Sequence, residues 1–266
     1  MSFYSDCLRK ALADGHIVAT DRVLVVGGGE TDRKTLNELG FKNVLITNLA
    51  PHAGQEEYLP YQWQREDAEN LTFADQSFDW AIEHAALHHL GSPHKGLLEM
   101  LRVSTRGVIA FEARDSALMR VAVRLGLSSD YELEPAFLSG GAGHGFRNTP
   151  IPNFVTRWKE VEVEKTVNSM YPSHRHGFKY FYGFTVPAQR FQMARSPFLR
   201  LIGKGLAFIA PALRFLLGKQ GNYFGFLVLK DIELQPWVKV GPSGEVTPDV
   251  DYLAKRYDRT KYKRNP

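Results

Sequence analysis

The stretch Arg22-Val-Leu-Val-Val-Gly-Gly-Gly29 decides the fold of this chain. After one arginine it is a continuous apolar run, which is typical of a central strand in a parallel sheet that is covered on both faces. Three glycines follow directly, and residues 31–39 then read as a helix that Gly40 ends. Because glycine allows a positive φ and a close approach of backbone to ligand, a glycine turn at this place predicts a nucleotide or cofactor site.

Strands and helices alternate on the C-terminal side of this turn. Apolar runs predict strands at 43–47, 79–83 and 107–112, and we expect a short strand at 61–66. Helices are expected over 92–104 and, before the turn, as a short amphipathic helix over 5–14. This alternation predicts βαβ units and a doubly wound parallel sheet. Beyond it we expect helices over 116–127 and 154–169, a glycine-rich loop over 128–153, and aromatic strands over 177–186 and 222–230.

Composition and charge exclude several classes of protein. The chain has 266 residues, of which 44% are hydrophobic and 23% charged, as in a globular protein with a core and unlike a disordered chain. A single cysteine, Cys7, favours a reducing, cytoplasmic compartment, and we expect no signal peptide. The net charge of +4 equals that of the residues from Asp251 onward, six basic and two acidic. The body therefore lacks the basic surplus of a dedicated nucleic-acid-binding protein.

Two cofactor chemistries compete for the glycine turn. The dinucleotide fingerprint G-x-G-x-x-G is met at Gly27 and Gly29, but its third glycine is replaced by Asp32. An acid at that position faces the pyrophosphate that the helix N-terminus attracts, so an oxidoreductase is disfavoured. The competing chemistry is a turn for S-adenosylmethionine.

Four pieces of the stretch 22–114 carry a family resemblance. They are Val23-Leu-Val-Val-Gly-Gly-Gly29; Asn48 after the second strand; Glu66-Asp-Ala-Glu-Asn-Leu-Thr-Phe73; and Ser77-Phe-Asp-Trp80 leading into Glu83-His-Ala-Ala-Leu-His-His-Leu90. In these pieces the chain resembles the class I S-adenosylmethionine-dependent methyltransferases, small-molecule type 11 group. The resemblance implies an α/β fold, a doubly wound seven-stranded Rossmann-like sheet with helices on both faces and a helical insertion before the last strand. It also implies S-adenosylmethionine as cofactor and a small-molecule acceptor.

The same resemblance implies a set of cofactor contacts. Asp67 accepts from the adenine amino group and main-chain carbonyls near Glu83 face the sulfonium; the full set is Gly27, Gly28, Gly29, Asn48, Leu49, Asp67, Ala68 and Glu83. Val25 and Asn48 stand where the family has acids, and Thr31 where it often has a further glycine. These departures keep a second hypothesis open, a catalytically degenerate protein that uses the fold for binding or scaffolding.

Histidines after the fourth strand are the candidates for acid–base chemistry. His84 and His88 are candidate catalytic bases, because histidine titrates near neutral pH. The candidate acceptor contacts are polar residues at predicted strand ends and in the glycine-rich loop: His89, Glu112, Arg114, His144, Arg147 and His176. Beyond the adjacent His88 and His89 we find no metal-ligand spacing, so no metal site is predicted.

The segment 196–219 combines a broad apolar surface with a narrow basic one. At helical spacing Arg200, Lys204 and Arg214 share one arc, and these charges with Pro211 argue against a membrane-spanning helix. A helical cap that packs on the domain, or on the second subunit of a homodimer, is our first interpretation. The second is a helix on a membrane surface, which favours a sugar or lipid-linked glycan acceptor.

The domain organisation follows from these assignments. We expect one methyltransferase domain over 1–245, with the cofactor core at 15–114 and the acceptor and cap elements at 115–219. A basic tail then covers 246–266.

Overall fold

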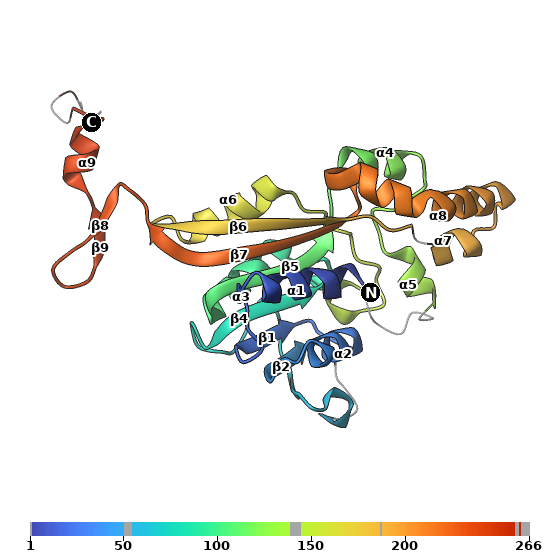
Figure 1. The fold of residues 1–266 in the computed structure, drawn as a ribbon, viewed down its shortest axis with the longest axis horizontal. Helices are drawn as coiled ribbons and strands as arrows, with labels where there is room; N and C mark the ends of the chain where they lie inside the picture. The colour runs from blue at the N-terminus through green and yellow to red at the C-terminus, as the bar shows by residue number, and fades with distance from the viewer. Residues whose placement is uncertain (1, 51–54, 139–144, 187, 259–260, 262–266) are drawn as a thin grey trace.

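A seven-stranded sheet forms the centre of the molecule (Figure 1). The computed structural model describes residues 2–50, 55–138, 145–186, 188–258 and 261. The strand order is β3-β2-β1-β4-β5-β7-β6, with β7 antiparallel to both β5 and β6 and the other neighbours parallel. The strands are β1 (Arg22–Val26), β2 (Asn43–Asn48), β3 (Gln62–Arg65), β4 (Phe78–His84), β5 (Ser104–Ala113), β6 (His174–Gly183) and β7 (Tyr223–Leu234). The predicted doubly wound α/β sheet is confirmed.

The apolar run of β1 is explained by its two buried faces. Val23 and Val25 pack into the core cluster that contains Tyr4, whereas Leu24 and Val26 pack into the cluster that contains Trp158. These four apolar residues of β1 are at most 1% exposed. A strand with two buried faces needs apolar residues at every position, which is why the run shows no alternation.

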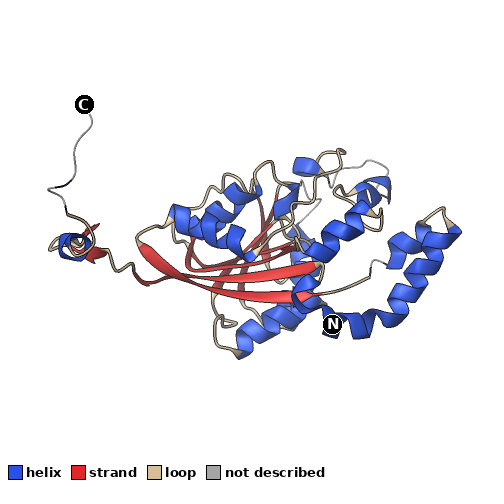
Figure 2. Ribbon diagram, turned by 90° about the horizontal axis from the view of Figure 1, so that it is seen from above, coloured by secondary structure: helices blue, strands red, loops and turns tan. Residues whose placement is uncertain are grey.

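Helices cover both faces of the sheet, as the view in Figure 2 shows. Helix α2 begins directly after the glycine turn, and α3 begins at Pro93 after the Ser92 cap, whose side chain accepts from Lys95 N. The helices around the sheet and its C-terminal edge are α1 (Phe3–Ala13), α2 (Glu30–Glu38), α3 (Pro93–Val103), α4 (Ala117–Arg124), α5 (Leu133–Leu138) and α6 (Glu160–Met170). Short 3₁₀ turns are η1 (Gln55–Tyr58), η2 (Leu87–His89), η3 (Phe146–Asn148) and η4 (Gly218–Gln220).

Two helices are inserted between β6 and β7, as the expected helical insertion requires. They are α7 (Ala188–Met193) and α8 (Pro197–Leu217), and they extend from the end of the sheet at which α4 and α5 also lie (Figure 1). Among the helices of the described residues, none is both long enough and apolar enough to cross a membrane.

The elements after β7 project away from the body. A hairpin of β8 (Val238–Val240) and β9 (Val246–Pro248) leads into α9 (Val250–Ala254), and the three extend from the opposite end of the sheet (Figure 1). The expected boundary at 245/246 falls inside this hairpin.

Two expectations about the second half need correction. The helix predicted over 154–169 begins at Glu160, because Phe154 pairs with Tyr131 and Trp158 with Arg114 in isolated bridges that keep this segment extended. The predicted loop over 128–153 contains α5 and η3. His144, a predicted acceptor contact, lies outside the described residues.

Candidate active site

A cavity of about 340 Å³ lies at the carboxyl ends of β1, β2, β3 and β4. Most of the predicted cofactor contacts line this smaller cavity: Gly27, Gly29, Asn48, Leu49, Asp67 and Ala68. The strand order reverses beside β1, and ligands of open α/β sheets bind in the crevice at such a switch point. The volume falls in the range of small-molecule sites.

Each of the three glycines of the turn has a different structural role. Gly27 has φ +65°, and a Cβ there would come within 2.5 Å of Ala86 Cβ. Gly28 is turned toward the core, where a Cβ would meet Val25, and its N–H donates to Thr47 O. A Cβ on Gly29, by contrast, meets nothing within 4 Å. Gly27 therefore allows the left-handed backbone of the turn, and Gly28 allows close packing against the core. Gly29 leaves the cavity open.

Asp32 explains why the third fingerprint position is acidic. Its Oδ2 accepts from Gly29 N at 2.9 Å, so the first turn of α2 is closed by a carboxylate from within the helix. Burial raises the pKa of Asp32, although the hydrogen bond from Gly29 opposes that rise. Asp32 thus orders the glycine turn.

Asn48 uses its side chain to join two strand ends. Its Nδ2 donates to Gly28 O at 3.0 Å and its Oδ1 accepts from Ala50 N at 3.0 Å. An amide can do both at once, whereas a carboxylate cannot donate to a carbonyl. Asn48 therefore lines the cavity and fixes the glycine turn at the same time.

Asp67 is held by an arginine from far along the chain. Arg147 Nη2 lies 2.7 Å from Asp67 Oδ2, and its Nη1 contacts Glu69. Glu69 also accepts from Gly91 N and Ser92 N, which ties this loop to the start of α3. Partial burial raises the pKa of Asp67, but the Glu69 amide and Arg147 outweigh it and lower the pKa below its usual value. The structure thus places Arg147 in the smaller cavity rather than at an acceptor site.

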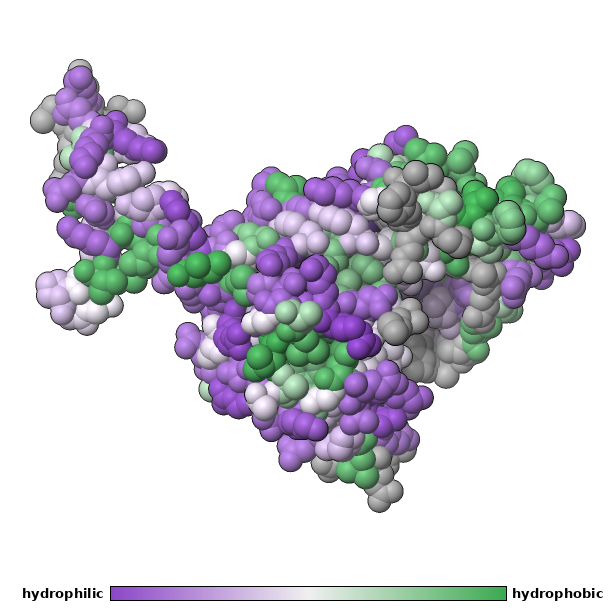
Figure 3. Space-filling view, in the orientation of Figure 1, coloured by the Kyte–Doolittle hydropathy of each residue, from purple (hydrophilic) through white to green (hydrophobic). Residues whose placement is uncertain are grey.

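A second cavity, of about 1050 Å³, lies beside the first. It is bounded by the ends of β4 and β5 and by residues of α1, α4, α5, α7 and α8. Among the described residues, Ala85 alone lines both cavities. Exposed apolar side chains gather over α4 and α8, where Figure 3 shows a hydrophobic area: Val121, Leu125, Phe198, Leu201, Phe208 and Ile209.

His84 and His88 both line the larger cavity, in different electrostatic surroundings. The His84 ring stacks on Tyr4 with 4.3 Å between ring centroids, and burial lowers its pKa. His88 Nδ1 lies 2.6 Å from Glu112 Oε2. Burial opposes a charge on His88, but Glu112 and Glu132 overcome it and raise its pKa to about 10. His84 is therefore neutral at pH 7, whereas His88 is protonated when only protein groups surround it.

Glu83 is a buried support of the site. It is fully buried and lines neither cavity; its Oε1 accepts from Phe111 N at 2.8 Å and its Oε2 from Ala86 N at 2.9 Å. Burial and the Glu112 carboxylate raise the pKa of Glu83. Its side chain thus fixes the backbone between β4 and η2 against β5.

Three predicted acceptor contacts are placed elsewhere. Arg114 is buried and bidentate to Glu160 at 2.9 and 3.0 Å, so it ties β5 to α6. His89 lines the smaller cavity. His176 lies at the opposite edge of the sheet, because β6 runs antiparallel to β7 and pairs its first residues with the last of β7. There Nε2 of His176 faces Tyr171 O at 3.2 Å and Nδ1 accepts from Asp231 N, so it belongs to no acceptor site.

A comparison of the sequence with known protein families finds a match. Residues 27–111 match the family described as methyltransferase domain. The match begins at the glycine turn and ends in β5, so it covers the strand ends that form the smaller cavity. Residues 27–111 are therefore a methyltransferase domain. This methyltransferase uses S-adenosylmethionine as its cofactor, and the residues around the smaller cavity fit it: an open glycine turn, a carboxylate at Asp67 and the neighbouring Ala68.

Solved structures similar to this methyltransferase share little of its sequence. A possible histamine N-methyltransferase from Thermotoga maritima is 14% identical with a TM-score of 0.45. The alignment covers 84% of this chain and 88% of the chain of that protein. Magnesium protoporphyrin IX methyltransferase from Synechocystis PCC 6803 with bound S-adenosylhomocysteine is 13% identical with a TM-score of 0.47, covering 85% and 81%. A putative methyltransferase from Bacillus halodurans is 14% identical with a TM-score of 0.47, covering 83% and 96%. No curated protein matches the sequence.

Proposed function

We propose that the two cavities divide the methyl transfer between them. The smaller cavity binds S-adenosylmethionine, the larger one holds a small-molecule acceptor, and the methyl group crosses at Ala85. The observation that carries this proposal is the shared lining: both cavities lie at the carboxyl edge of the sheet and Ala85 lines both. Ala85 has φ +56° and its N–H donates to Phe111 O at 2.8 Å, so a strained backbone is held at the junction.

The chain's own groups bind and orient the cofactor. S-adenosylmethionine supplies, when bound, a methyl group on a positively charged sulfonium. Asp67 accepts from the adenine, Ala68 donates from its backbone, and the turn from Gly27 to Gly29 gives the methionine and ribose room. Since Arg147 pairs with Asp67, it closes the adenine end of the cavity and shares that carboxylate. Asn48 holds the turn in place while it faces the ribose side.

His84 is the base in this proposal. It lines the larger cavity and its pKa is lowered by burial, so its imidazole accepts a proton at neutral pH. His88 is held by Glu112 at 2.6 Å and is already protonated in the free protein, which disfavours it as a base. A positioned base is worth about 10²–10⁴-fold in rate. His84 therefore takes the proton of a hydroxyl acceptor.

The acceptor that suits the larger cavity is amphipathic, such as a sugar carried on a lipid. Polar groups of Glu112, Glu132 and Arg157 line the cavity. Its volume of about 1050 Å³ is at the upper limit of typical small-molecule sites. Exposed apolar side chains of α5 line the cavity, Leu133 and Phe137 at 59% and 81% exposure, and they match a hydrophobic tail. An apolar surface with basic residues is also what a helix at a membrane surface presents.

A transfer assay with matched variants tests the site assignment. The protein is incubated with methyl-labelled S-adenosylmethionine and a panel of free and lipid-linked sugars, and labelled product is measured. We expect transfer to a lipid-linked sugar, a loss of about 10²-fold or more in His84→Gln, and no change in His94→Gln, whose side chain pairs with Glu162 outside both cavities. Full activity of His84→Gln removes His84 from the site.

Flotation with anionic liposomes tests the membrane contact of 196–219 separately. We expect the protein to float at low salt and a Phe198→Ser/Phe208→Ser variant to remain at the bottom of the gradient. Absence of flotation by the wild-type protein refutes the membrane-surface interpretation. The cap interpretation then stands, with α8 packed on the body or on a second subunit.

A further inference from the structure

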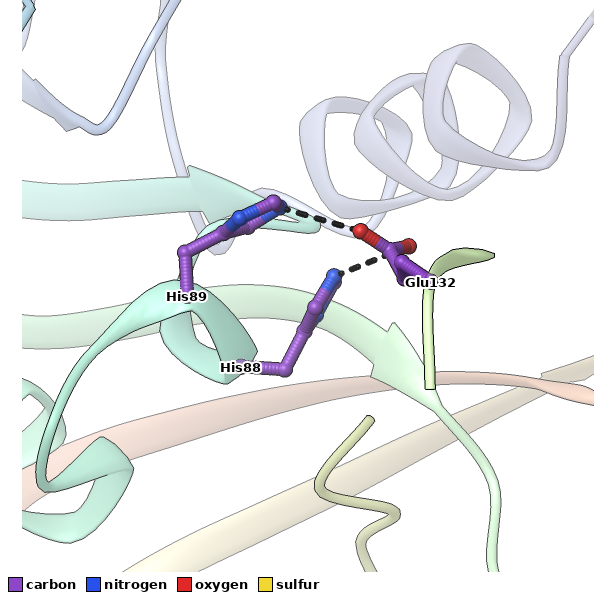
Figure 4. A group of neighbouring side chains, drawn as sticks. All are labelled: His88, His89 and Glu132. Carbon is purple, nitrogen blue, oxygen red and sulfur yellow. Dashed lines mark ion pairs between the residues drawn. The ribbon is translucent and has the colours of Figure 1, made fainter. Parts of the chain in front are cut away.

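Three side chains from distant parts of the chain meet between the two cavities. His88 and His89 come from η2 after β4, and Glu132 comes from the segment just before α5 (Figure 4). His88 Nε2 lies 3.4 Å from Glu132 Oε1, and His89 Nε2 lies 3.5 Å from Glu132 Oε2. One atom from each of the three residues lies within 4.8 Å of the other two. His88 and Glu132 line the larger cavity and His89 the smaller.

Both histidines are oriented through their other ring nitrogen. His88 Nδ1 lies 2.6 Å from Glu112 Oε2, and His89 Nδ1 lies 3.3 Å from Gly145 O. Acceptors at both Nδ1 atoms fix the rings so that both Nε2 atoms face Glu132. A carboxylate or carbonyl behind the imidazole is the usual support of a metal-binding histidine, because it fixes the tautomer and the ring orientation.

The distances to Glu132 suit a shared ion better than direct hydrogen bonds. A histidine–carboxylate hydrogen bond has a nitrogen-to-oxygen distance of about 2.7–3.2 Å, and the pair of His88 and Glu112 is closer still at 2.6 Å. Nε2 of His88 is buried and makes no hydrogen bond with any residue that the structure describes. Two ligand atoms that each lie about 2.1 Å from a tetrahedral ion are about 3.4 Å apart. The two distances to Glu132 have this value.

Glu132 is held at the histidines by a buried asparagine. Asn153 is 1% exposed; its backbone oxygen accepts from Glu132 N at 3.1 Å and its Nδ2 donates to His88 O at 3.3 Å. The segment with Glu132 is therefore attached to η2 by one side chain. The side chains of Glu132 and His89 remain 27% and 29% exposed, which leaves room for an ion to enter and for further ligands.

We propose that His88, His89 and Glu132 bind a divalent transition-metal ion, with an open coordination position toward the larger cavity. Two imidazoles and a carboxylate suit Zn²⁺, Fe²⁺ or Co²⁺ rather than Mg²⁺ or Ca²⁺, which prefer oxygen ligands. Three protein ligands leave room for a ligand from outside, as in catalytic metal sites. The ion's role rests on the proposed function: it binds an oxygen of the acceptor at the junction, and the acceptor class it favours is a hydroxyl compound.

Titration with Co²⁺ tests the site without any methyl-transfer assay. The protein is freed of metal with a chelator and titrated with Co²⁺, whose visible absorption reports its coordination, with bound metal counted by elemental analysis. We expect one tightly bound Co²⁺ per chain. Glu132→Gln and His89→Ala should each weaken binding by about 10-fold or more, and Glu112→Gln, which leaves the ligands in place, by about 10–100-fold.

A second histidine–glutamate pair provides the matched control. His94 Nε2 lies 2.9 Å from Glu162 Oε1, so His94→Ala removes a comparable pair outside the cluster and should leave Co²⁺ binding unchanged. Thermal unfolding of each variant verifies that it is folded. No stoichiometric Co²⁺ in the wild-type protein, or equal binding by folded Glu132→Gln, overturns the metal site. Calorimetry of S-adenosylhomocysteine with the metal-free protein reports on the cofactor cavity by itself, so the two proposals fail separately.

Discussion

Two substitutions in the glycine turn are expected to affect different properties, one the stability of the fold and the other the binding of the cofactor. Gly27→Ala puts a side chain on a backbone with φ +65° and 2.5 Å from Ala86 Cβ. A left-handed non-glycine residue costs about 1–2 kcal/mol. Forcing a methyl group into the packed contact costs about 1–3 kcal/mol more. Gly27→Ala should therefore destabilise the fold by about 2–5 kcal/mol, which lowers Tm by roughly 5–15 °C in a chain of this size.

Gly29→Ala is the matched control for that reasoning. Gly29 has φ −144°, which any residue adopts, and a Cβ there meets no atom within 4 Å. The loss of a glycine N-cap costs about 1 kcal/mol or less, so Tm should fall by only a few degrees. The added methyl group instead enters the space that the cofactor needs, so binding of S-adenosylhomocysteine should weaken by about 10-fold or more.

Thermal unfolding and calorimetry of the two variants separate stability from binding. Two results refute the reasoning: Gly29→Ala as unstable as Gly27→Ala, or Gly29→Ala with the affinity of the wild-type protein for S-adenosylhomocysteine. The first result means that the turn has no open side, and the second that the cofactor lies elsewhere.

Three further predictions follow from individual contacts. Asp67→Ala should weaken the binding of S-adenosylhomocysteine by about 1–3 kcal/mol, because a buried hydrogen bond to adenine is lost while the exposed pair with Arg147 contributes little. Unchanged affinity in calorimetry contradicts the adenine placement. In an assay of kcat/KM against pH, the acidic limb should fall through a pKa under 6.5, since burial favours neutral His84, and this limb should disappear in His84→Gln; its persistence there assigns it to another group. Glu160 has a pKa of about 2, because Arg114 and Tyr182 outweigh its partial burial. A carboxyl with a lowered folded-state pKa stabilises the fold above its ordinary value of 4.5, and this is lost as the pH falls toward 2. The Tm difference between wild type and Glu160→Gln should thus shrink between about pH 7 and about pH 3, and a constant difference contradicts the ion pair.

The parts of the structure that the sequence predicted are those made by neighbouring residues. The strand–turn–helix around Gly27 to Gly29 follows from a buried run, a glycine cluster and a helix start, all within one short stretch. The pieces that contain Asn48 and Asp67 each follow a predicted strand, and strand ends of a parallel sheet meet at one edge. The alternation of strands and helices and most of the lining of the smaller cavity could therefore be anticipated without coordinates.

Contacts between distant segments were out of reach for sequence reasoning. Arg147 reaches Asp67 across 80 residues, from an η3 turn in which Arg147 itself has φ +46°. Glu132 is an ordinary acid in a predicted loop until the fold brings it to His88 and His89. His176 was expected beside the acceptor, but the direction of β6, which no local pattern reveals, carries it to the other edge.

Calorimetric titration with S-adenosylhomocysteine, with NADH as the control ligand, tests the central claim most directly. A ligand of about 26 non-hydrogen atoms that gains about 0.3 kcal/mol per atom binds with a Kd on the order of 1 μM. We predict one site per chain with an affinity of that order, reduced in Asp67→Ala, and no heat with NADH. Binding of NADH, or S-adenosylhomocysteine that binds equally to the wild-type protein and Asp67→Ala, contradicts the assignment of the smaller cavity to this cofactor.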